Sequence, residues 1–148
     1  MKLIKLSPKM MKSETKKGES PNKKTILIVE DETALLRALS DKFTREGFTV
    51  LKAGDGMEGL TLAIRKHPDL ILLDVILPKC DGIETLKALR ADEWGKNAEV
   101  ILLTNLDESD KIAAAMSFGA REYLVKSEWR IEDVVKKVKE RLGMGSAA

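Results

Sequence analysis

The chain has 148 residues, which is enough for one domain with a substantial hydrophobic core and too few for two domains of ordinary size. Hydrophobic residues make up 43% of the chain and charged residues 34%, as in typical globular proteins. No apolar run approaches the roughly 20 residues of a membrane-spanning helix, and the lysine-interrupted start is no signal-peptide core. We therefore expect a cytoplasmic protein without a membrane span.

The net charge of +2 conceals an uneven distribution. Residues 1–24 contain eight lysines and two glutamates, a charge of +6, which leaves 18 basic and 22 acidic residues, or −4, for the rest. This basic leader, rich in Ser, Thr, Pro and Gly, is predicted to be disordered, either as a solvated tail or as a weak electrostatic tether to an acidic partner or membrane. Because the basic excess lies in the leader and not on a folded face, we expect no direct contact with nucleic acid.

The single cysteine, Cys80, excludes an internal disulfide, and no Cys/His cluster is available for zinc. Cys80 follows Pro78 in a predicted turn, where we expect a thiol without a chemical role.

From Thr25 onward, short apolar runs alternate with helical patterns. The pattern predicts strands over 26–29, 48–53, 70–73, 100–103 and 123–126, and helices over about 33–46, 55–66, 82–91, 108–118 and 129–142. Such alternation is typical of a doubly wound α/β domain, here over 25–143, with a frayed C-terminus over 144–148. The runs over 26–29, 70–73 and 100–103 are continuously apolar and so should be the central strands, and the other two should be the edges.

Local signals mark several helix ends. Gly47 is predicted to end the first helix, and Asp55 with Glu58 forms a capping-box pattern at the start of the second. Asp107 or Ser109 would cap the helix over 108–118.

Polar residues stand at the carboxyl ends of four of the predicted strands. Glu30 and Asp31 follow the first strand, Asp74 the third, Thr104 the fourth and Lys126 ends the fifth. The carboxyl ends of parallel strands meet at one edge of the sheet, where ligands bind in open α/β folds.

These residue types together favour phosphoryl transfer. Three clustered carboxylates repel one another unless a cation joins them, and few hard oxygen ligands suit Mg²⁺, or Mn²⁺. A metal, the Thr104 hydroxyl and the Lys126 ammonium would clamp a transferring phosphoryl group. Asp74 is the oxygen nucleophile at the centre, so the expected product is an aspartyl phosphate. Each residue alone also fits a structural role, since Asp31 could simply cap the next helix, but their joint occurrence favours a site.

Four motifs carry a resemblance to a known family: Ile26 to Asp31, Leu72 to Gly82, Val100 to Thr104, and Tyr123 to Lys126. From about Thr25 to Leu142 the chain resembles a response-regulator receiver domain of two-component signalling, in a stand-alone form. The resemblance implies a flavodoxin-like (βα)5 fold with strand order 2-1-3-4-5. It also implies that Asp74 receives its phosphoryl group from the phosphohistidine of a histidine kinase or a phosphotransfer protein.

The resemblance further implies a metal site. Asp31 and Asp74 would bind Mg²⁺ directly, together with the backbone carbonyl of Ile76, and Glu30 would act largely through water.

Other implied roles concern switching. Thr104 and the backbone of Asn105 would bind the phosphoryl group, Lys126 would pair with it, and Tyr123 would turn inward as the switch aromatic. The output face would consist of the helix over 108–118, the strand over 123–126 and the helix over 129–142. Because no output domain is predicted after the last helix, the chain would dock on a downstream target, form a homodimer, or relay phosphate onward. It would catalyse its own phosphorylation and dephosphorylation rather than turn over a separate substrate.

The chain departs from the family pattern after Lys126 and after Thr104. Ser127 stands where the family mostly has proline, often cis, so we expect a trans bond with Ser127 capping the last helix. Asn105 replaces a small residue. Ile76 and Leu106 are both apolar and cannot orient an attacking water, which predicts a long-lived phosphorylated state.

Two other enzyme or binding classes fit less well. A phosphatase of the haloacid-dehalogenase type would need a second Asp at position 76, and a flavin or nucleotide binder would need a phosphate loop in place of residues 30–32. An interaction module that no longer takes phosphate remains the alternative, because Ser127 and Asn105 depart from the family.

Overall fold

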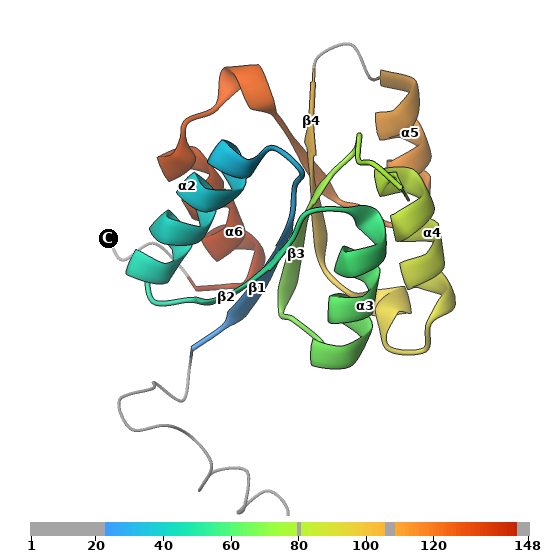
Figure 1. Ribbon diagram of the computed structural model, residues 1–148, viewed down its shortest axis with the longest axis horizontal. Helices are drawn as coiled ribbons and strands as arrows, with labels where there is room; N and C mark the ends of the chain where they lie inside the picture. Colours follow the sequence, from blue (N-terminus) through green and yellow to red (C-terminus); the bar gives the residue numbers. More distant parts are fainter. Residues whose placement is uncertain (1–22, 80, 106–108, 145–148) are drawn as a thin grey trace, which may run out of the picture.

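The computed structural model describes residues 23–79, 81–105 and 109–144. Five parallel strands form one sheet: β1 (Thr25–Val29), β2 (Thr49–Ala53), β3 (Leu70–Asp74), β4 (Val100–Thr104) and β5 (Glu122–Val125). Their order is β2-β1-β3-β4-β5, which confirms the predicted flavodoxin-like topology (Figure 1). The continuously apolar strands β1, β3 and β4 are central, as predicted.

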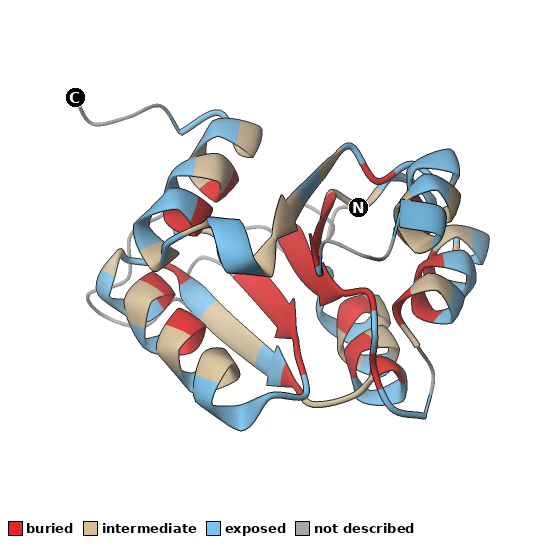
Figure 2. Cartoon of the chain, turned by 90° about the horizontal axis from the view of Figure 1, so that it is seen from above, coloured by how far each residue is buried: buried red, intermediate tan, exposed pale blue. Residues whose placement is uncertain are grey.

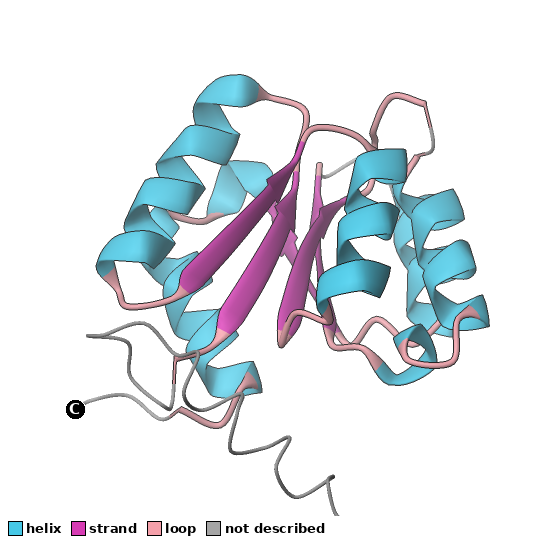
Figure 3. Ribbon diagram, turned by 60° about the horizontal axis from the view of Figure 1, so that its bottom comes forward, coloured by secondary structure: helices cyan, strands magenta, loops and turns pink. Residues whose placement is uncertain are grey.

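Helices cover both faces of the sheet (Figures 1 and 3). The helices α2 (Thr33–Arg45) and α6 (Ile131–Arg141) lie on one face. On the other face lie α3 (Gly56–Lys66), α4 (Gly82–Ala91) and α5 (Ser109–Ser117). Two short 3-10 helices, η1 (Gly95–Asn97) and η2 (Lys126–Glu128), complete the connections.

The central strands contribute to two hydrophobic cores by alternation. In β1, Ile26 and Ile28 pack in the core under α2 and α6, while Leu27 and Val29 pack in the core under α3, α4 and α5. All four are at most 1% exposed, and the buried strands form the middle layer in Figure 2. Because helices cover both faces, every residue of the central strands except Thr25 is buried, which explains the unbroken apolar runs.

The predicted cap at the start of α3 is present. The Asp55 side chain accepts a hydrogen bond from the Glu58 backbone N–H at 2.9 Å, and the Glu58 carboxylate accepts one from the Gly54 N–H at 3.0 Å. The helix ends at Lys66, and His67 follows with a left-handed φ of 49°. This turn directs the chain through Pro68 into β3.

Around Lys126 the prediction needs three corrections. The last strand ends at Val125, and Lys126 begins η2. The last helix begins at Ile131, not Trp129, and Ser127 does not cap it, because the 3-10 turn and an extended Trp129 separate Ser127 from the helix. At the start of α6 the Asp133 carboxylate accepts from the Arg130 N–H at 2.9 Å instead. No described peptide bond is cis, so the expected trans bond before Ser127 is confirmed.

Several predictions fall on residues outside the described ranges: the leader over 1–22, Cys80, Leu106, Asp107 and residues 145–148. Ser109 is the first residue of α5. Among the helices of the described residues, none combines the length and apolar character needed to cross a membrane.

Candidate functional site

The strand register brings the predicted site residues to one edge of the sheet. Val29, the last residue of β1, pairs with Leu73, so Glu30 follows β1 where Asp74 ends β3. On the next strands Thr104 pairs with Val125, which precedes Lys126. Side chains from distant parts of the chain therefore meet at the carboxyl edge.

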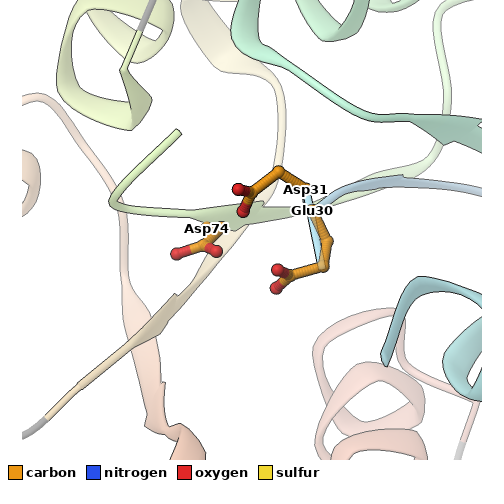
Figure 4. A group of neighbouring side chains, drawn as sticks. All are labelled: Glu30, Asp31 and Asp74. Carbon is orange, nitrogen blue, oxygen red and sulfur yellow. The ribbon is translucent and has the colours of Figure 1, made fainter. Parts of the chain in front are cut away.

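Glu30, Asp31 and Asp74 form an acidic cluster at this edge (Figure 4). One carboxylate oxygen from each residue lies within 4.8 Å of the others. Glu30 is 0% exposed and Asp74 4% exposed, whereas Asp31 is open to solvent. The cluster therefore has two buried carboxylates and one accessible one.

Lys126 lies between the two buried carboxylates. Its Nζ is 2.8 Å from Asp74 Oδ2 and 2.8 Å from Glu30 Oε1. Sequence analysis anticipated a phosphoryl-binding ammonium near Asp74 but missed the contact with Glu30. No local sequence signal could have indicated it, since the partners come from opposite ends of the domain.

Burial dominates the titration of the cluster. It raises the pKa of Glu30 to about 7, against the hydrogen bond from Lys126 and with added repulsion from Asp74. Burial also raises the pKa of Asp74, and the hydrogen bond from Lys126 partly offsets this rise. The pKa of Lys126 is raised, because its bonds to Asp74 and Glu30 outweigh its own burial. A single ammonium therefore does not fully offset the cost of burying two carboxylates.

Backbone amides hold the remaining carboxylate oxygens. The Ile76 N–H donates to Asp74 Oδ1 at 3.1 Å, and the Glu32 N–H donates to Glu30 Oε2 at 2.9 Å. The Ile76 side chain is 44% exposed beside the acidic site. These bonds orient both carboxylates toward the centre of the cluster.

Thr104 lies at the end of β4 and is 0% exposed. Its hydroxyl donates to the Asn105 carbonyl at 3.1 Å, while the Asn105 side chain faces solvent. Their expected contacts with a phosphoryl group stay predictions.

The expected output face includes exposed apolar residues. Tyr123 in β5 is 44% exposed and Met116 in α5 is 38% exposed, whereas Ala115 is fully buried. Trp129 is partly buried against the core under α2 and α6. Tyr123 thus points outward in this structure, which is the starting position that an inward-turning switch aromatic would need.

Gly82, which the sequence analysis did not single out, lies against the strand that ends in Asp74. A Cβ at Gly82 would lie 2.3 Å from the Asp74 carbonyl oxygen and 2.7 Å from Val75 Cα. The Gly82 N–H donates to the Val75 carbonyl at 2.9 Å. Only glycine allows α4 to begin this close to Asp74.

The donor set fits a magnesium ion. All three side chains offer hard carboxylate oxygens, and the exposed Asp31 leaves one side accessible to water or phosphate oxygens. Three carboxylates lie together in the cluster and Lys126 contacts two of them, so its one positive charge faces three acidic side chains. A divalent cation would supply the missing positive charge.

Comparisons with known proteins agree with this geometry. Residues 26–139 match the family model described as response regulator receiver domain. The chain is 33% identical over 121 residues to sporulation initiation phosphotransferase F of Bacillus subtilis, covering 82% of this chain and 95% of that one. The chain therefore belongs to the family of response regulator receiver domains, which in two-component systems interact with histidine kinases and downstream effectors.

Solved structures share the fold. A CheY-like receiver domain protein from Methanospirillum hungatei JF-1 superposes with a TM-score of 0.76 at 28% identity, covering 83% of this chain and 96% of that one. The receiver domain of a sensor histidine kinase from Pseudomonas aeruginosa PAO1 gives a TM-score of 0.74 at 26% identity, over 82% and 98% of the two chains. In that structure a magnesium ion is coordinated in the active-site cleft.

Several other relatives are longer proteins described as transcriptional regulators. The chain spans 43% of the first of these relatives and 50% of the second, about half their length.

Proposed function

We propose that this receiver domain accepts a phosphoryl group from a phosphohistidine onto Asp74 in a magnesium-dependent reaction. One observation carries the proposal: the carboxylates of Glu30, Asp31 and Asp74 converge within 4.8 Å, and the Lys126 ammonium lies against Asp74. The phosphotransferase relative supports it, because that protein aligns over nearly its whole length.

In the proposed reaction an oxygen of the Asp74 carboxylate attacks the phosphorus atom. The phosphorus–nitrogen bond of the phosphohistidine breaks, and the imidazole leaves with the bonding electron pair and takes up a proton. Lys126 is already 2.8 Å from Asp74 Oδ2, so its ammonium is placed to pair with the incoming phosphoryl oxygens. The buried Thr104 hydroxyl and the Asn105 backbone lie at the end of the adjacent strand and would bind the same group.

Asp31 and Asp74 would hold the magnesium ion, with Glu30 behind them. The ion supplies positive charge that offsets repulsion between the carboxylates and the incoming phosphate. The N–H of Ile76 donates to Asp74 Oδ1, and the backbone carbonyl of Ile76 would complete the set of protein ligands.

The proposed phosphodonor is a sensor histidine kinase or a phosphotransfer protein. The output would go through the face formed by α5, β5 and α6, where Met116 and Tyr123 expose apolar surface. A phosphoryl group brings nearly two negative charges next to Thr104 and Lys126. These charges would interact differently with the two conformations of a switch, and that difference would shift the equilibrium between them. The phosphorylated conformation could then dock on a target protein, form a homodimer or pass the phosphoryl group onward.

Intact-mass spectrometry after incubation with magnesium and acetyl phosphate tests the proposal. The wild-type protein should gain one phosphoryl group, and Asp74→Asn should gain none. Asp41→Asn, an exposed carboxylate on α2, is the matched control and should behave like wild type. No gain in the wild type, or an equal gain in Asp74→Asn, would overturn the proposal and favour a phosphorylation-independent interaction module.

A further inference from the structure

A cavity lies at the opposite edge of the sheet from Asp74. It has a volume of about 450 Å³ and lies where α4 ends, η1 follows, and the chain turns from α5 into β5. Its lining includes Arg90, Lys96, Ala98, Glu99, Phe118 and Arg121. The size is within the ordinary range for small-molecule sites.

The lining carries an excess of positive charge. Its one carboxylate, Glu99, is already neutralised by Arg141, whose Nε donates to Glu99 Oε2 at 2.8 Å. Lys96 has only an exposed contact of 3.4 Å with Glu93. Within the described residues, neither Arg90 nor Arg121 forms an ion pair with a carboxylate.

Arg90 is anchored in a way that leaves one edge of its guanidinium for a ligand. Its Nε donates to the Phe118 carbonyl at 2.6 Å, and its Nη1 donates to the carbonyls of Gly95 and Ala98 at 2.7 and 2.9 Å. These bonds occupy carbonyl oxygens that would otherwise repel an anion. No hydrogen bond of Nη2 to another described residue is present, and Nη2 lies beside Gly119.

The second guanidinium lies close enough to repel the first. Burial lowers the pKa of Arg90, Glu99 opposes this shift, and the nearby Arg121 adds to it. Carbonyl oxygens accept hydrogen bonds from Arg90 but carry no net charge. Because Glu99 is paired with Arg141, the two neighbouring guanidinium groups of Arg90 and Arg121 would be best balanced by a doubly charged anion.

We propose that this cavity binds a small phosphate-bearing molecule, with the phosphate between Arg121 and Nη2 of Arg90 and the organic part against Phe118 and Ala98. A phosphate monoester carries close to two negative charges at neutral pH, and guanidinium groups bind its oxygens in pairs. The site is separate from the phosphoacceptor edge and does not depend on phosphorylation of Asp74.

Amide chemical shifts of the full chain, titrated with ribose 5-phosphate at constant ionic strength, test the proposal. A chelator is included to remove divalent metal, because a metal ion at the Asp74 edge would itself attract phosphate. We expect saturable shifts at Asn97, Ala98 and Gly119 with a dissociation constant below about 1 mM, the upper range for small substrates. Ribose without phosphate should give none.

Arg121→Gln should weaken binding by at least about tenfold, since it removes one of two charge-assisted partners. Arg121 is exposed and its replacement leaves the Arg90 bonds in place. Arg37→Gln, an exposed arginine on α2 outside the cavity, should bind like wild type.

A parallel titration with inorganic phosphate shows whether the cavity recognises an organic phosphate or free phosphate. Tighter binding of ribose 5-phosphate than of inorganic phosphate supports an organic phosphate, and equal binding supports recognition of free phosphate by the same two arginines. The proposal fails if no saturable shifts occur, if they cluster at the Asp74 edge, or if Arg121→Gln binds as tightly as wild type.

Discussion

Glu30 is a carboxylate in an environment that disfavours its charge. It is fully buried, and its pKa is raised to about 7 although Lys126 Nζ lies 2.8 Å away. The group binds its proton more tightly in the folded than in the unfolded protein. Its contribution to stability is therefore present at low pH and is lost as the pH rises from about 4.5 toward 7.

We expect the free energy of unfolding of the metal-free wild type to fall between pH 5 and 7.5, and to fall less in Glu30→Gln. The difference in slope should be up to about 1.4 kcal/mol per pH unit for one group. Urea unfolding in chelator measures it, and groups that titrate alike in both proteins cancel in the comparison. Identical slopes for the two proteins would contradict the assignment of this pH dependence to Glu30.

Ile76 is the residue expected to govern how long the phosphoryl group survives. Its side chain is apolar and 44% exposed, two positions after Asp74, so it cannot orient an attacking water. We expect Ile76→Asn to shorten the lifetime about tenfold, a barrier change of about 1.4 kcal/mol. The decay of the phosphorylated mass after removal of the donor measures this lifetime.

Met57→Asn is the matched control for Ile76→Asn, because Met57 is also apolar and exposed, but lies in α3. It should leave the lifetime unchanged. A wild-type lifetime of only seconds would contradict the expectation of a long-lived phosphorylated state.

At the scale of elements, α4 couples the strand that ends in Asp74 to the helix layer. Its first residue, Gly82, packs against the backbone of Asp74 and Val75 without room for a Cβ. The Asp81 side chain caps the helix by accepting from the Glu84 N–H at 2.9 Å. The start of α4 therefore sets the position of the Asp74 backbone.

Gly82→Ala should destabilise the protein by about 1–3 kcal/mol, because the added methyl group overlaps backbone that cannot give way. It should also slow phosphorylation of Asp74 by displacing that residue. Gly54→Ala is the control, since a Cβ there meets nothing within 4 Å. Denaturant unfolding and the rate of mass gain measure both effects, and equal results for the two variants would exclude the proposed coupling.

The connection from β5 to α6 shows where apolar periodicity alone was insufficient. The apolar periodicity of Val134, Val135 and Val138 identified the last helix correctly. Its first turn was misplaced because η2 takes up residues 126–128 and Trp129 packs against the core before the helix begins. The helix begins where the Asp133 carboxylate accepts from the Arg130 N–H, a local pairing that the sequence analysis did not use.

At the scale of the whole molecule, two hydrophobic cores on opposite faces of the sheet hold the acidic cluster at its edge. The cores fix the strand register, and the register brings together carboxylates that repel one another. A cation that binds only the folded chain should therefore stabilise the fold by mass action.

Magnesium at ten times its dissociation constant should raise the free energy of unfolding by about 1.4 kcal/mol. Asp31→Asn should lose most of this gain, because Asp31 is the accessible carboxylate of the cluster. Asp41→Asn should keep it. Thermal unfolding with magnesium or chelator measures the gain, and an equal gain in Asp31→Asn would contradict the assignment of the metal to this cluster.

The residues alone predicted which strands are central and that Glu30, Asp31, Asp74 and Thr104 share one edge of the sheet, whereas the strand order was predicted from the resemblance to receiver domains. The two predictions from the residues follow from local signals, because a short unbroken apolar run bounded by turn residues is typical of a strand covered on both faces. The contacts of Lys126 with both Glu30 and Asp74, the latter 52 residues away in the chain, are visible only in the folded structure. The meeting of Arg90 and Arg121 in one cavity is likewise visible only there. Such contacts depend on packing between distant segments, and packing leaves no periodic pattern in the sequence.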